Sequence, residues 1–358
     1  MTDRRRRIGE GGAAGAPLTS RRILLGHGSG GKLYRDLVKD VFVRAFANPV
    51  LDRLDDAATL APSGRIAFTT DSHVVQPLRF AGGDIGRLSV AGTVNDLATA
   101  AARPLALAAA FVIEEGFALD ELRAVCASMA ATAHEADVPI VTGDTKVVER
   151  GAADGLFITT TGVGEIVVAH ELGAAAVRDG DAVILSGSIG DHAVAILAAR
   201  GEFHFSAAVE SDCAPLWDVV VAALAGARGV GGEEAVRFLR DPTRGGLTTV
   251  LAELAEESGL GIEVEEDAIP VSPAVRSVCD LLGYDPLTLA NEGKMVIVAA
   301  AEAADAVVAA VRGTEHGREA RRIGFVTAAH PGRVALRTEF GTRRVLDMPV
   351  GELLPRIC

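Results

Sequence analysis

The residues that could do chemistry include the last one, because the 358-residue chain ends on Cys358. Chain ends are usually the loosest part of a domain, so a thiol placed there can swing into a site elsewhere and carry an acyl group. It is also open to oxidation, which makes an unused terminal thiol a liability. The alternative is a cysteine that stands there by chance, and the residue alone does not decide between the two.

A second group of candidates is a series of aspartates set mostly beside glycine, threonine or asparagine, which let a ligand approach closely. One aspartate of this kind is usually a turn former or a helix cap. Several carboxylates together suit Mg²⁺ with a nucleoside triphosphate, where one or two per metal suffice. The series therefore predicts a metal–nucleotide site at the ends of secondary-structure elements. Its members are Asp56 in LDDAATL, Asp71 in FTTDSHVV, Asp96 in GTVNDLA, Asp144 in VTGDTK and Asp241 in RDPTRGG.

A glycine-rich segment, GHGSGGK over 26–32, fits most of a Walker A motif. The next residue is Leu33, where that motif needs serine or threonine for Mg²⁺. The apolar run over 23–25 is also too short for a core strand, so we exclude a P-loop. Two interpretations remain, a loop that covers a phosphate with backbone N–H groups and a lysine, or a flexible loop end. The phosphate contacts would come from Gly28, Gly30, Gly31 and Lys32.

The elements that must position these residues follow from hydrophobic periodicity. Helices are predicted over 33–42, 84–102, 119–136, 191–200, 247–254, 272–282 and 302–312. Strands are predicted over 65–70, 105–113, 138–142, 155–163, 181–187, 261–266, 294–300, 321–327 and 333–338. Mixed strands and helices in both halves predict two α/β domains. We expect a disordered leader over 1–20, an N-terminal domain over 21–170, a C-terminal domain over 171–344 and a flexible tail over 345–358.

Composition excludes several classes of protein. The net charge is −13, with 35 basic and 48 acidic residues, which argues against a nucleic-acid partner. No run of about 18 apolar residues is present, so no membrane span is expected. The four cysteines form no CxxC pair, which favours the reducing cytoplasm over a disulfide framework. Cys126, on an apolar helix face, is expected in the core.

These segments occur in an order that closely resembles the HypE family of hydrogenase maturation proteins. The resemblance covers about 22–358, and it places the chain in the wider superfamily of aminoimidazole ribonucleotide synthetases, selenophosphate synthetases and thiamine-monophosphate kinases. The terminal cysteine selects HypE within that superfamily. One departure is the run over 100–104, AAARP, where relatives carry a Gly-Ala pair. The matching segments are GHGSGGK, DDAATL, TTDSHVV, GGDIG, GTVNDLA, FVIEEGF, VTGDTKVV, DPTRGGL, LANEGKM and the final PRIC.

The resemblance implies a two-domain fold of the aminoimidazole ribonucleotide synthetase type, which dimerises through N-terminal sheets that close a shared barrel. It also implies ATP and Mg²⁺ between the acidic loops and the second domain. A carbamoyltransferase, HypF, would load a carbamoyl group on Cys358. ATP-dependent dehydration would turn this group into a thiocyanate, whose cyanide passes to iron on a HypC–HypD complex for a [NiFe]-hydrogenase.

The family pattern also implies roles for individual residues. Cys358 would carry the substrate, Glu292 would act as the base, and Lys146 would be an electrostatic clamp near the modified cysteine. Without the resemblance, a helix-cap glutamate and a solvated lysine are the simpler interpretations. Nucleotide contacts are expected, besides the glycine loop, from Asp71, Asn95, Asp96, Thr145 and Arg244, with the five aspartates as metal ligands.

Two other functions stay open at this point. One is another ATP-using enzyme of the superfamily, such as a selenophosphate synthetase or a small-molecule kinase. The glycine loop lacks the cysteine that a selenophosphate synthetase needs, and a kinase would have no need of Cys358. The other is a non-catalytic scaffold, which would tolerate the loss of acidic loops that are all present.

Overall fold

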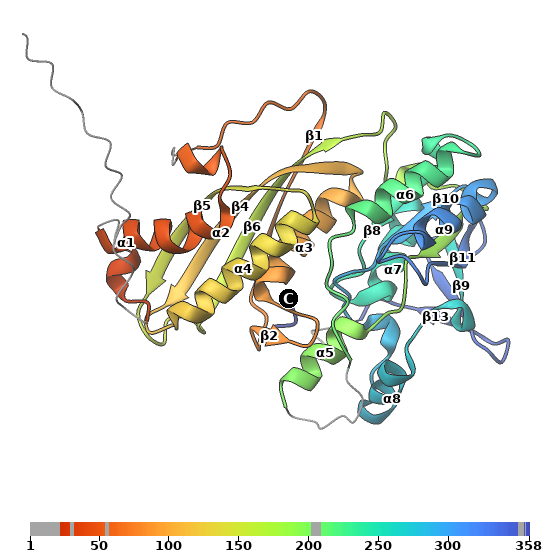
Figure 1. Ribbon diagram of the computed structural model, residues 1–358. Coiled ribbons are helices and arrows are strands. Elements are labelled where there is room, and N and C mark those ends of the chain that lie inside the picture. The colour runs from red at the N-terminus through yellow and green to blue at the C-terminus, as the bar shows by residue number, and fades with distance from the viewer. Residues whose placement is uncertain (1–21, 29–31, 54–56, 202–208, 350–353, 355) are drawn as a thin grey trace, which may run out of the picture.

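The computed structural model describes residues 22–28, 32–53, 57–201, 209–349, 354 and 356–358 (Figure 1). The leader predicted over 1–20 lies outside these residues, as do Gly30, Gly31 and Asp56. The described chain folds into two units, each built around its own sheet, and the predicted mixed α/β fold is confirmed. The domain divisions after residues 20 and 170 stay predictions.

The first unit holds a four-stranded sheet in the order β1-β6-β4-β5. Strands β1, β6 and β4 pair antiparallel, whereas β4 and β5 pair parallel. Helices α3 and α4 cover one face of this sheet (Figure 1). The strands are β1 (Ile66–His73), β4 (Ala102–Glu114), β5 (Ile140–Val148) and β6 (Leu156–Ile166), and the helices are α3 (Ile85–Thr99) and α4 (Leu119–Glu135).

The other face of this sheet is open in the single chain. Strand residues alternate between the two faces, so Ile158 lies under the helices while Phe68 and Val112 point to the open side. Phe68 is 69% exposed and Ile66 is 52% exposed. Large apolar side chains on an uncovered sheet face mark a surface that another molecule covers.

Helix α3 is buried nearly all round because it lies between the first sheet and the second unit. Its N-terminus is capped by Asp84, whose side chain accepts from the Arg87 N–H at 2.8 Å. A short hairpin of β2 (Arg79–Phe80) and β3 (Gly83–Asp84) leads into it. A central buried helix of this kind can present polar side chains to both units.

The chain before β1 packs against the edge of the first sheet that β5 forms. After the 3-10 turn η1 (Leu25–Gly28), α1 (Lys32–Leu37) continues through a π-helical stretch η2 (Val38–Val43) into α2 (Arg44–Phe46). The rings of Phe42 and Phe111 lie 4.8 Å apart. The segment 22–25 before the loop forms only an isolated bridge at Arg22, which agrees with excluding a P-loop.

The second unit holds a seven-stranded sheet in the order β13-β12-β9-β11-β7-β10-β8. The strands are β7 (Ala182–Leu185), β8 (Val236–Arg240), β9 (Gly261–Glu265), β10 (Val296–Ala299), β11 (Arg321–Thr327), β12 (Val334–Arg337) and β13 (Arg343–Leu346). The helices are α5 (Asp191–Ala199), α6 (Trp217–Arg228), α7 (Gly246–Ser258), α8 (Pro273–Leu282) and α9 (Ala304–Arg312).

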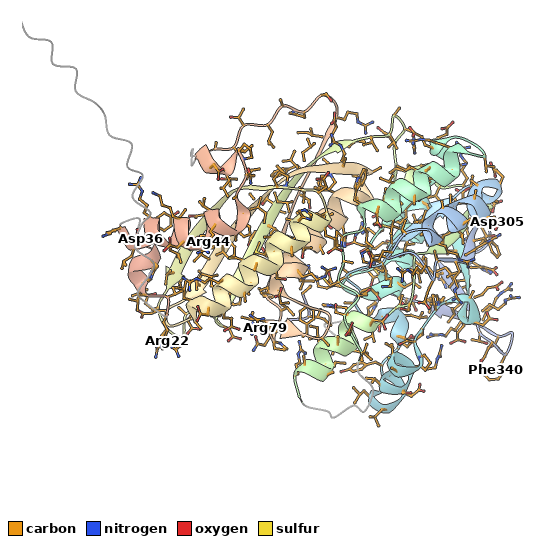
Figure 2. All side chains as sticks on the ribbon, in the orientation of Figure 1. Arg22, Asp36, Arg44, Arg79, Asp305 and Phe340 are labelled. Atoms are coloured by element: carbon orange, nitrogen blue, oxygen red, sulfur yellow. The ribbon has the colours of Figure 1, made fainter. Side chains whose placement is uncertain are left out.

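Both faces of the seven-stranded sheet are covered. Ile184 of β7 packs with α6 and α9, and its neighbour Val183 packs with α7 on the other side. Charged side chains such as Arg22, Arg44 and Asp305 project from the outside of the two units (Figure 2). The central strands β7 and β10 are buried on both faces, which explains why their sequences read as continuous apolar runs.

The structure corrects three expectations about element ends. Asp71 and Asp144 lie inside β1 and β5 and not after them, because both strands run several residues further than their apolar cores. Strand β13 ends at Leu346, so the segment predicted as a tail from 345 begins inside the sheet. Helix α6 and strand β8 were not predicted. In α6, the run Val219–Val221 obscures the helical period of the apolar residues.

Candidate active site

Four acidic side chains gather where the two units meet. Asp71 comes from β1, Asp96 from the middle of α3, Asp241 follows β8, and Glu292 lies in the loop before β10. The Thr69 hydroxyl donates to Asp96 Oδ2 at 2.8 Å. These contributions come from distant parts of the sequence, so the cluster exists only in the folded chain.

The charges in this cluster are not compensated. Burial, together with Asp96 and Asp71, raises the pKa of Asp241 to about 7. Burial, Asp241 and Asp212 raise the pKa of Glu292 well above its ordinary range, and burial with Asp71 raises that of Asp96. Glu292 is 4% exposed, and its Oε1 has no hydrogen-bond partner among the described residues. Buried carboxylates that lie near one another and lack hydrogen-bond partners attract a cation.

Among the described residues, no three histidine, cysteine, aspartate or glutamate side chains are gathered closely enough to hold a metal ion as they stand. Arg244 lies close enough to His73 for its charge to contribute to the lowered pKa of that histidine, which is caused mainly by burial. The structure thus brings together Asp71, Asp96, Asp241, Glu292 and Arg244 from the residues predicted for the site.

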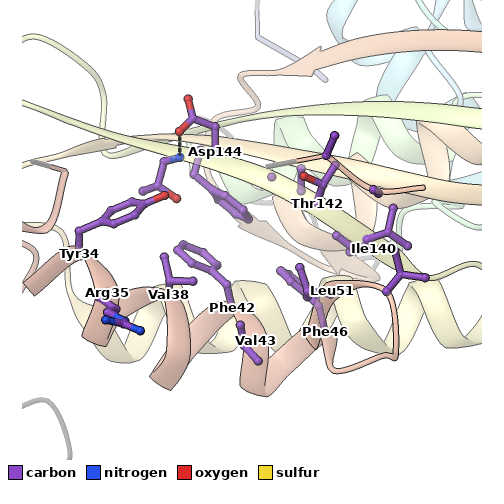
Figure 3. Close-up of a pocket in the computed structure, with 18 residues that line it drawn as sticks. Tyr34, Arg35, Val38, Phe42, Val43, Phe46, Leu51, Ile140, Thr142 and Asp144 are labelled. Atoms are coloured by element: carbon purple, nitrogen blue, oxygen red, sulfur yellow. Dashed lines mark hydrogen bonds between the residues drawn. The ribbon is translucent and has the colours of Figure 1, made fainter. Parts of the chain in front are cut away.

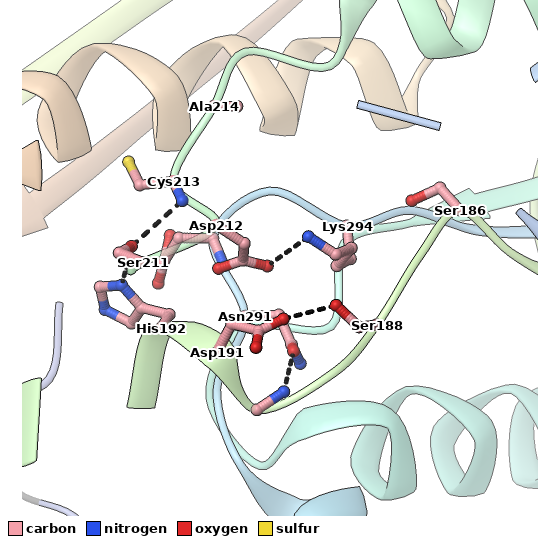
Figure 4. A network of polar contacts seen from close by, with 12 residues as sticks. Ser186, Ser188, Asp191, His192, Ser211, Asp212, Cys213, Ala214, Asn291 and Lys294 are labelled. Atoms are coloured by element: carbon pink, nitrogen blue, oxygen red, sulfur yellow. Dashed lines mark hydrogen bonds and ion pairs between the residues drawn. The ribbon is translucent and has the colours of Figure 1, made fainter. Parts of the chain in front are cut away.

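The loop that carries Glu292 is fixed by a buried polar network (Figure 4). The Glu292 N–H donates to Asp212 Oδ1 at 3.1 Å, and Lys294 Nζ donates to Asp212 Oδ2 at 3.0 Å. Burial opposes ionisation of Asp212, but the charge and the hydrogen bond of Lys294 lower its pKa overall. Asn291 Oδ1 accepts from the Gly190 N–H at 2.7 Å. The glutamate therefore stands on a rigid support.

Asn95 has a different role from the one predicted. Its amide nitrogen donates to the carbonyls of Ala214 at 3.0 Å and Glu292 at 3.3 Å. Its amide oxygen accepts from the Leu216 N–H at 2.8 Å. The protein main chain engages both ends of this amide, so Asn95 holds the loop that carries Glu292 in place.

The last three residues are docked between the two units, close to β2 and α5 (Figure 1). The Val74 N–H donates to the Cys358 carbonyl oxygen at 3.1 Å, directly after the strand that carries Asp71 and His73. Ile357 is buried and packs in the core with Cys358 against it. The terminal cysteine therefore lies at the end of the strand that supplies the acidic cluster.

The remaining predicted residues lie at the other edge of the first sheet. Lys146 and Asp144 form an exposed ion pair of 2.7 Å on β5. Lys146 of β5 lies opposite Val112 of β4, Val112 lies opposite Phe157 of β6, and β1 is the strand beside β6. Strands β5 and β1 are therefore three strand spacings apart, which is roughly 14 Å. The prediction that Lys146 lies near the modified cysteine is therefore wrong within one chain.

The glycine loop belongs to this second edge. A Cβ on Gly28 would lie 2.6 Å from the backbone nitrogen of Val147, so only glycine allows the loop to lie flat on β5. Lys32 begins α1 beside it. Thr145 is buried on the helix side of β5, where its N–H donates to Asp144 Oδ1 at 2.8 Å.

A cavity of about 460 Å³ opens beside this edge (Figure 3). Its walls are mainly apolar and aromatic, and Asp144 and Thr142 add polar groups. The aromatic lining residues are Tyr34, Phe42, Phe46 and Phe111. Apolar walls with a few polar groups are typical of pockets for small ligands.

Several residues of the buried polar network were not predicted from the sequence. Asp212 and His192 lie outside every segment that carried the family resemblance, and no periodic or spacing signal marked them. Lys294 stood inside LANEGKM, but the motif alone gave no sign of its buried partner. Contacts of this kind depend on long-range packing, which one sequence does not reveal.

The comparisons with known proteins agree with this arrangement. Residues 54–166 match the family model "AIR synthase related protein, N-terminal domain", and 178–337 match the corresponding C-terminal domain. Carbamoyl dehydratase HypE of Cupriavidus necator is 52% identical over 343 residues, which cover 95% of this chain and 96% of that protein. Carbamoyl dehydratase HypE of Escherichia coli is 45% identical, covering 94% and 99% respectively.

Solved structures give the same result. A crystal structure of the hydrogenase maturation protein HypE in complex with ATP superposes with a TM-score of 0.89 at 48% identity, covering 94% of this chain and 99% of that one. A chain of a HypE–HypF complex reaches a TM-score of 0.76 at 43% identity, covering 87% and 99%. In the described part of this chain, no helix is long and apolar enough to cross a membrane. The chain belongs to the HypE family of hydrogenase maturation proteins.

Proposed function

We propose that this protein is an ATP-dependent carbamoyl dehydratase that converts an S-carbamoyl group on Cys358 into a thiocyanate. The observation that carries this proposal is the position of the terminal cysteine, docked at the end of the strand that contributes Asp71 to the acidic cluster. Relatives up to 52% identical over nearly the whole chain are named carbamoyl dehydratases.

The reaction removes the oxygen of an amide, which is a poor leaving group. The amide oxygen attacks the γ-phosphorus of ATP, so an O–P bond forms and the bond to ADP breaks. The amide nitrogen then loses its two protons, the C–O bond breaks, and phosphate leaves. The products are a protein thiocyanate, ADP and phosphate. Phosphoryl transfer of this kind depends on positioning and on charge stabilisation.

Glu292 is the base that we assign to this reaction. Its raised pKa keeps the carboxyl protonated until the surrounding negative charge is reduced. A bound Mg²⁺, held by Asp71, Asp96 and Asp241, would neutralise phosphoryl charge and reduce this repulsion. Glu292 is then ready to accept a proton from the carbamoyl nitrogen.

The two groups of site residues lie at opposite edges of the first sheet, and a homodimer would unite them. We place a second copy on the open sheet face that exposes Phe68 and Ile66. If the two sheets close into a barrel about a two-fold axis, the β5 edge of each copy can lie beside the β1 edge of the other. Lys146 would then serve the Cys358 of the other copy.

The cavity at the β5 edge is our candidate for the adenine pocket. Aromatic walls such as Phe42 and Phe111 suit a purine ring. The adjoining glycine loop, with Gly28 and Lys32, would cover the phosphates. In the proposed dimer this places the triphosphate toward the acidic cluster of the neighbouring copy.

We propose HypF as the donor of the carbamoyl group and a HypC–HypD complex as the acceptor of the cyanide. A solved HypE–HypF complex, with a HypE chain 43% identical to this one, supports the first of these. The four cysteines form no disulfide in the structure, which fits a reducing cytoplasm.

Intact-protein mass spectrometry tests the proposed function. The wild-type protein, incubated with HypF, its carbamoyl donor and ATP, should gain a carbamoyl group and then lose water only when ATP is present. Cys358→Ala should gain no adduct while its fold and its ATP binding persist. A carbamoyl adduct that forms and never loses water would rule out the dehydratase.

A further inference from the structure

The carbonyl of Ile357 is held by a buried histidine that the reaction itself does not use. His192 Nε2 lies 2.8 Å from the Ile357 carbonyl oxygen, and His192 Nδ1 lies 2.8 Å from Ser211 Oγ. The Cys213 N–H donates to the same Ser211 hydroxyl at 3.1 Å. His192 is completely buried, stands on α5, and meets the ring of Phe80 edge-on.

The partners of His192 determine its tautomer. Burial lowers the pKa of His192, so the imidazole is neutral near pH 7. A neutral imidazole has one donor and one acceptor nitrogen. The Ile357 carbonyl can only accept, so Nε2 carries the proton, and Nδ1 accepts from the Ser211 hydroxyl. The chain of hydrogen bonds therefore runs in one direction, from the Cys213 N–H to the tail.

The other two terminal carbonyls are held as well. Arg200, just after α5, donates through Nη2 to the Arg356 carbonyl at 3.1 Å and through Nε to the Gln76 carbonyl at 3.1 Å. The Gln76 N–H also donates to the Arg356 carbonyl at 3.2 Å, and Val74 holds that of Cys358. These contacts engage the main chain of the last three residues.

The Arg356 side chain anchors the tail to the first unit. Its Nε donates to the Val74 carbonyl at 2.9 Å, it forms an ion pair with Asp154, and its guanidinium lies 5.9 Å from the centre of the Phe157 ring. Its φ of +52° is a left-handed conformation that a residue with a Cβ rarely adopts. Contacts of the docked state hold it there, so this conformation has no such support once the tail leaves.

We propose that His192 and Arg200 are positioning residues, which form a main-chain seat that sets the fraction of time Cys358 spends in the active site. This inference rests on the proposed function, in which the same thiol must also reach a carbamoyl donor and a cyanide acceptor outside. Both side chains act on carbonyls one and two residues before the cysteine.

The seat is also linked to the catalytic loop. Ser211, which orients His192, is followed by Asp212, and Asp212 accepts from the Glu292 N–H and pairs with Lys294. The segment 211–213 thus contacts the docked tail through His192 and the base through Asp212. Docking of the tail and placement of Glu292 depend on one short segment.

Alkylation of cysteines in the full-length protein, read by peptide mass spectrometry, measures seat occupancy without ATP or HypF. Loss of one buried hydrogen bond of about 1.4 kcal/mol corresponds to roughly a tenfold change in an equilibrium. His192→Ala should therefore raise the Cys358 alkylation rate roughly tenfold, and Arg200→Ala should raise it as well. His192→Gln, whose amide can donate to the Ile357 carbonyl, should restore slow alkylation.

The controls separate a seat from a general loss of structure. His134 is exposed on α4, so His134→Ala should alkylate at the wild-type rate. Cys126 and Cys213 are buried and should stay protected in every variant. Unchanged alkylation of Cys358 in His192→Ala, or faster alkylation of all the cysteines together, would overturn the proposal.

Single-turnover reactions then connect the seat to the chemistry. Protein carbamoylated in advance should dehydrate in proportion to the fraction of tails that stay docked, which the alkylation rates give for each variant, and loading by HypF should not slow. A dehydration rate in His192→Ala that departs from this docked fraction would contradict the seat. If wild-type protein also fails to dehydrate, the proposed function fails, while the alkylation result still decides whether the seat exists.

Discussion

At the scale of single residues, the site gathers buried carboxyl groups whose ionisation is unfavourable. Asp96, Asp241 and Glu292 all have raised pKa values, each caused first by burial and then by neighbouring carboxylates. A protein that only needed stability would not bury such a group without partners. These carboxyl groups become useful when a cation and a triphosphate bind. Their raised pKa values should be measurable in protein that holds neither ligand.

The stability of the metal-free protein should fall as the pH rises toward neutrality. The pKa of Asp241 is about 7 in the folded protein against 3.8 for the ordinary group. Between these values the folded state binds more protons than the unfolded state. The contribution of Asp241 to the free energy of unfolding is therefore fully present below pH 3.8 and is lost as the pH rises through 7.

Urea denaturation at a series of pH values checks this expectation. Asp241→Asn removes the titrating group, so its free energy of unfolding should depend less on pH across that window than that of the wild type. Equal pH dependence in the two proteins would show that Asp241 ionises normally in the folded state.

Glu292→Gln should accumulate the carbamoyl adduct, because the amide side chain keeps the size of glutamate but accepts no proton. Its rate of dehydration should fall by about two to four orders of magnitude, which is the usual contribution of a general base. For the wild type, the rate should rise with pH as Glu292 ionises. Quench-flow mass spectrometry measures both, and an unchanged rate in Glu292→Gln would remove this residue from the role of base.

At the scale of elements, the sequence predicted the helices and strands better than the contacts between their side chains. The helix expected over 119–136 is α4, that over 272–282 is α8, and the strand over 321–327 is β11, because periodic apolar faces determine such elements locally. The positions of Asp71 and Asp144 within strands were missed, since polar residues continue both strands past their apolar cores. The buried pair of Asp212 and Lys294 depends on packing between distant loops.

The glycine loop provides a prediction at this scale. Gly28→Ala would place a methyl group 2.6 Å from the Val147 nitrogen and push η1 away from β5. The KM for ATP should rise at least severalfold, while Cys358 alkylation stays unchanged because the tail docks at the other edge. Gly231→Ala is the matched control, since its nearest neighbour would be 3.8 Å away. A KM for ATP in Gly28→Ala equal to that of the wild type would show that the loop does not take part in nucleotide binding.

At the scale of the whole molecule, the described chain holds half of its proposed site at each edge of one sheet. Lys146 and Asp144 stand on β5, and the cysteine and the acidic cluster stand at β1. The open face between them exposes Phe68 and Ile66. We therefore expect the active form to be a dimer whose two sites are each built from both copies.

Mixed dimers test this expectation directly. A Lys146→Ala chain and a Cys358→Ala chain are each inactive alone in this account. Mixed at equal amounts, half of the dimers should contain one of each and one working site, so about one quarter of the wild-type activity should return. No recovery, with mixed dimers shown to form, would place Lys146 and Cys358 in the same chain's site, and activity of Lys146→Ala alone would exclude Lys146 from the site. Phe68→Asp on the open face should yield monomers by light scattering.

The central claim is that ATP activates the oxygen of a carbamoyl group carried by Cys358. Protein loaded with a carbamoyl group whose oxygen is a heavy isotope should, on addition of ATP, release inorganic phosphate that contains the label and leave a thiocyanate on Cys358. Mass spectrometry of the phosphate and of the C-terminal peptide measures both in one reaction. Label that appears in water instead of phosphate, or a carbamoyl group that persists on Cys358 while ATP is consumed, would contradict the account.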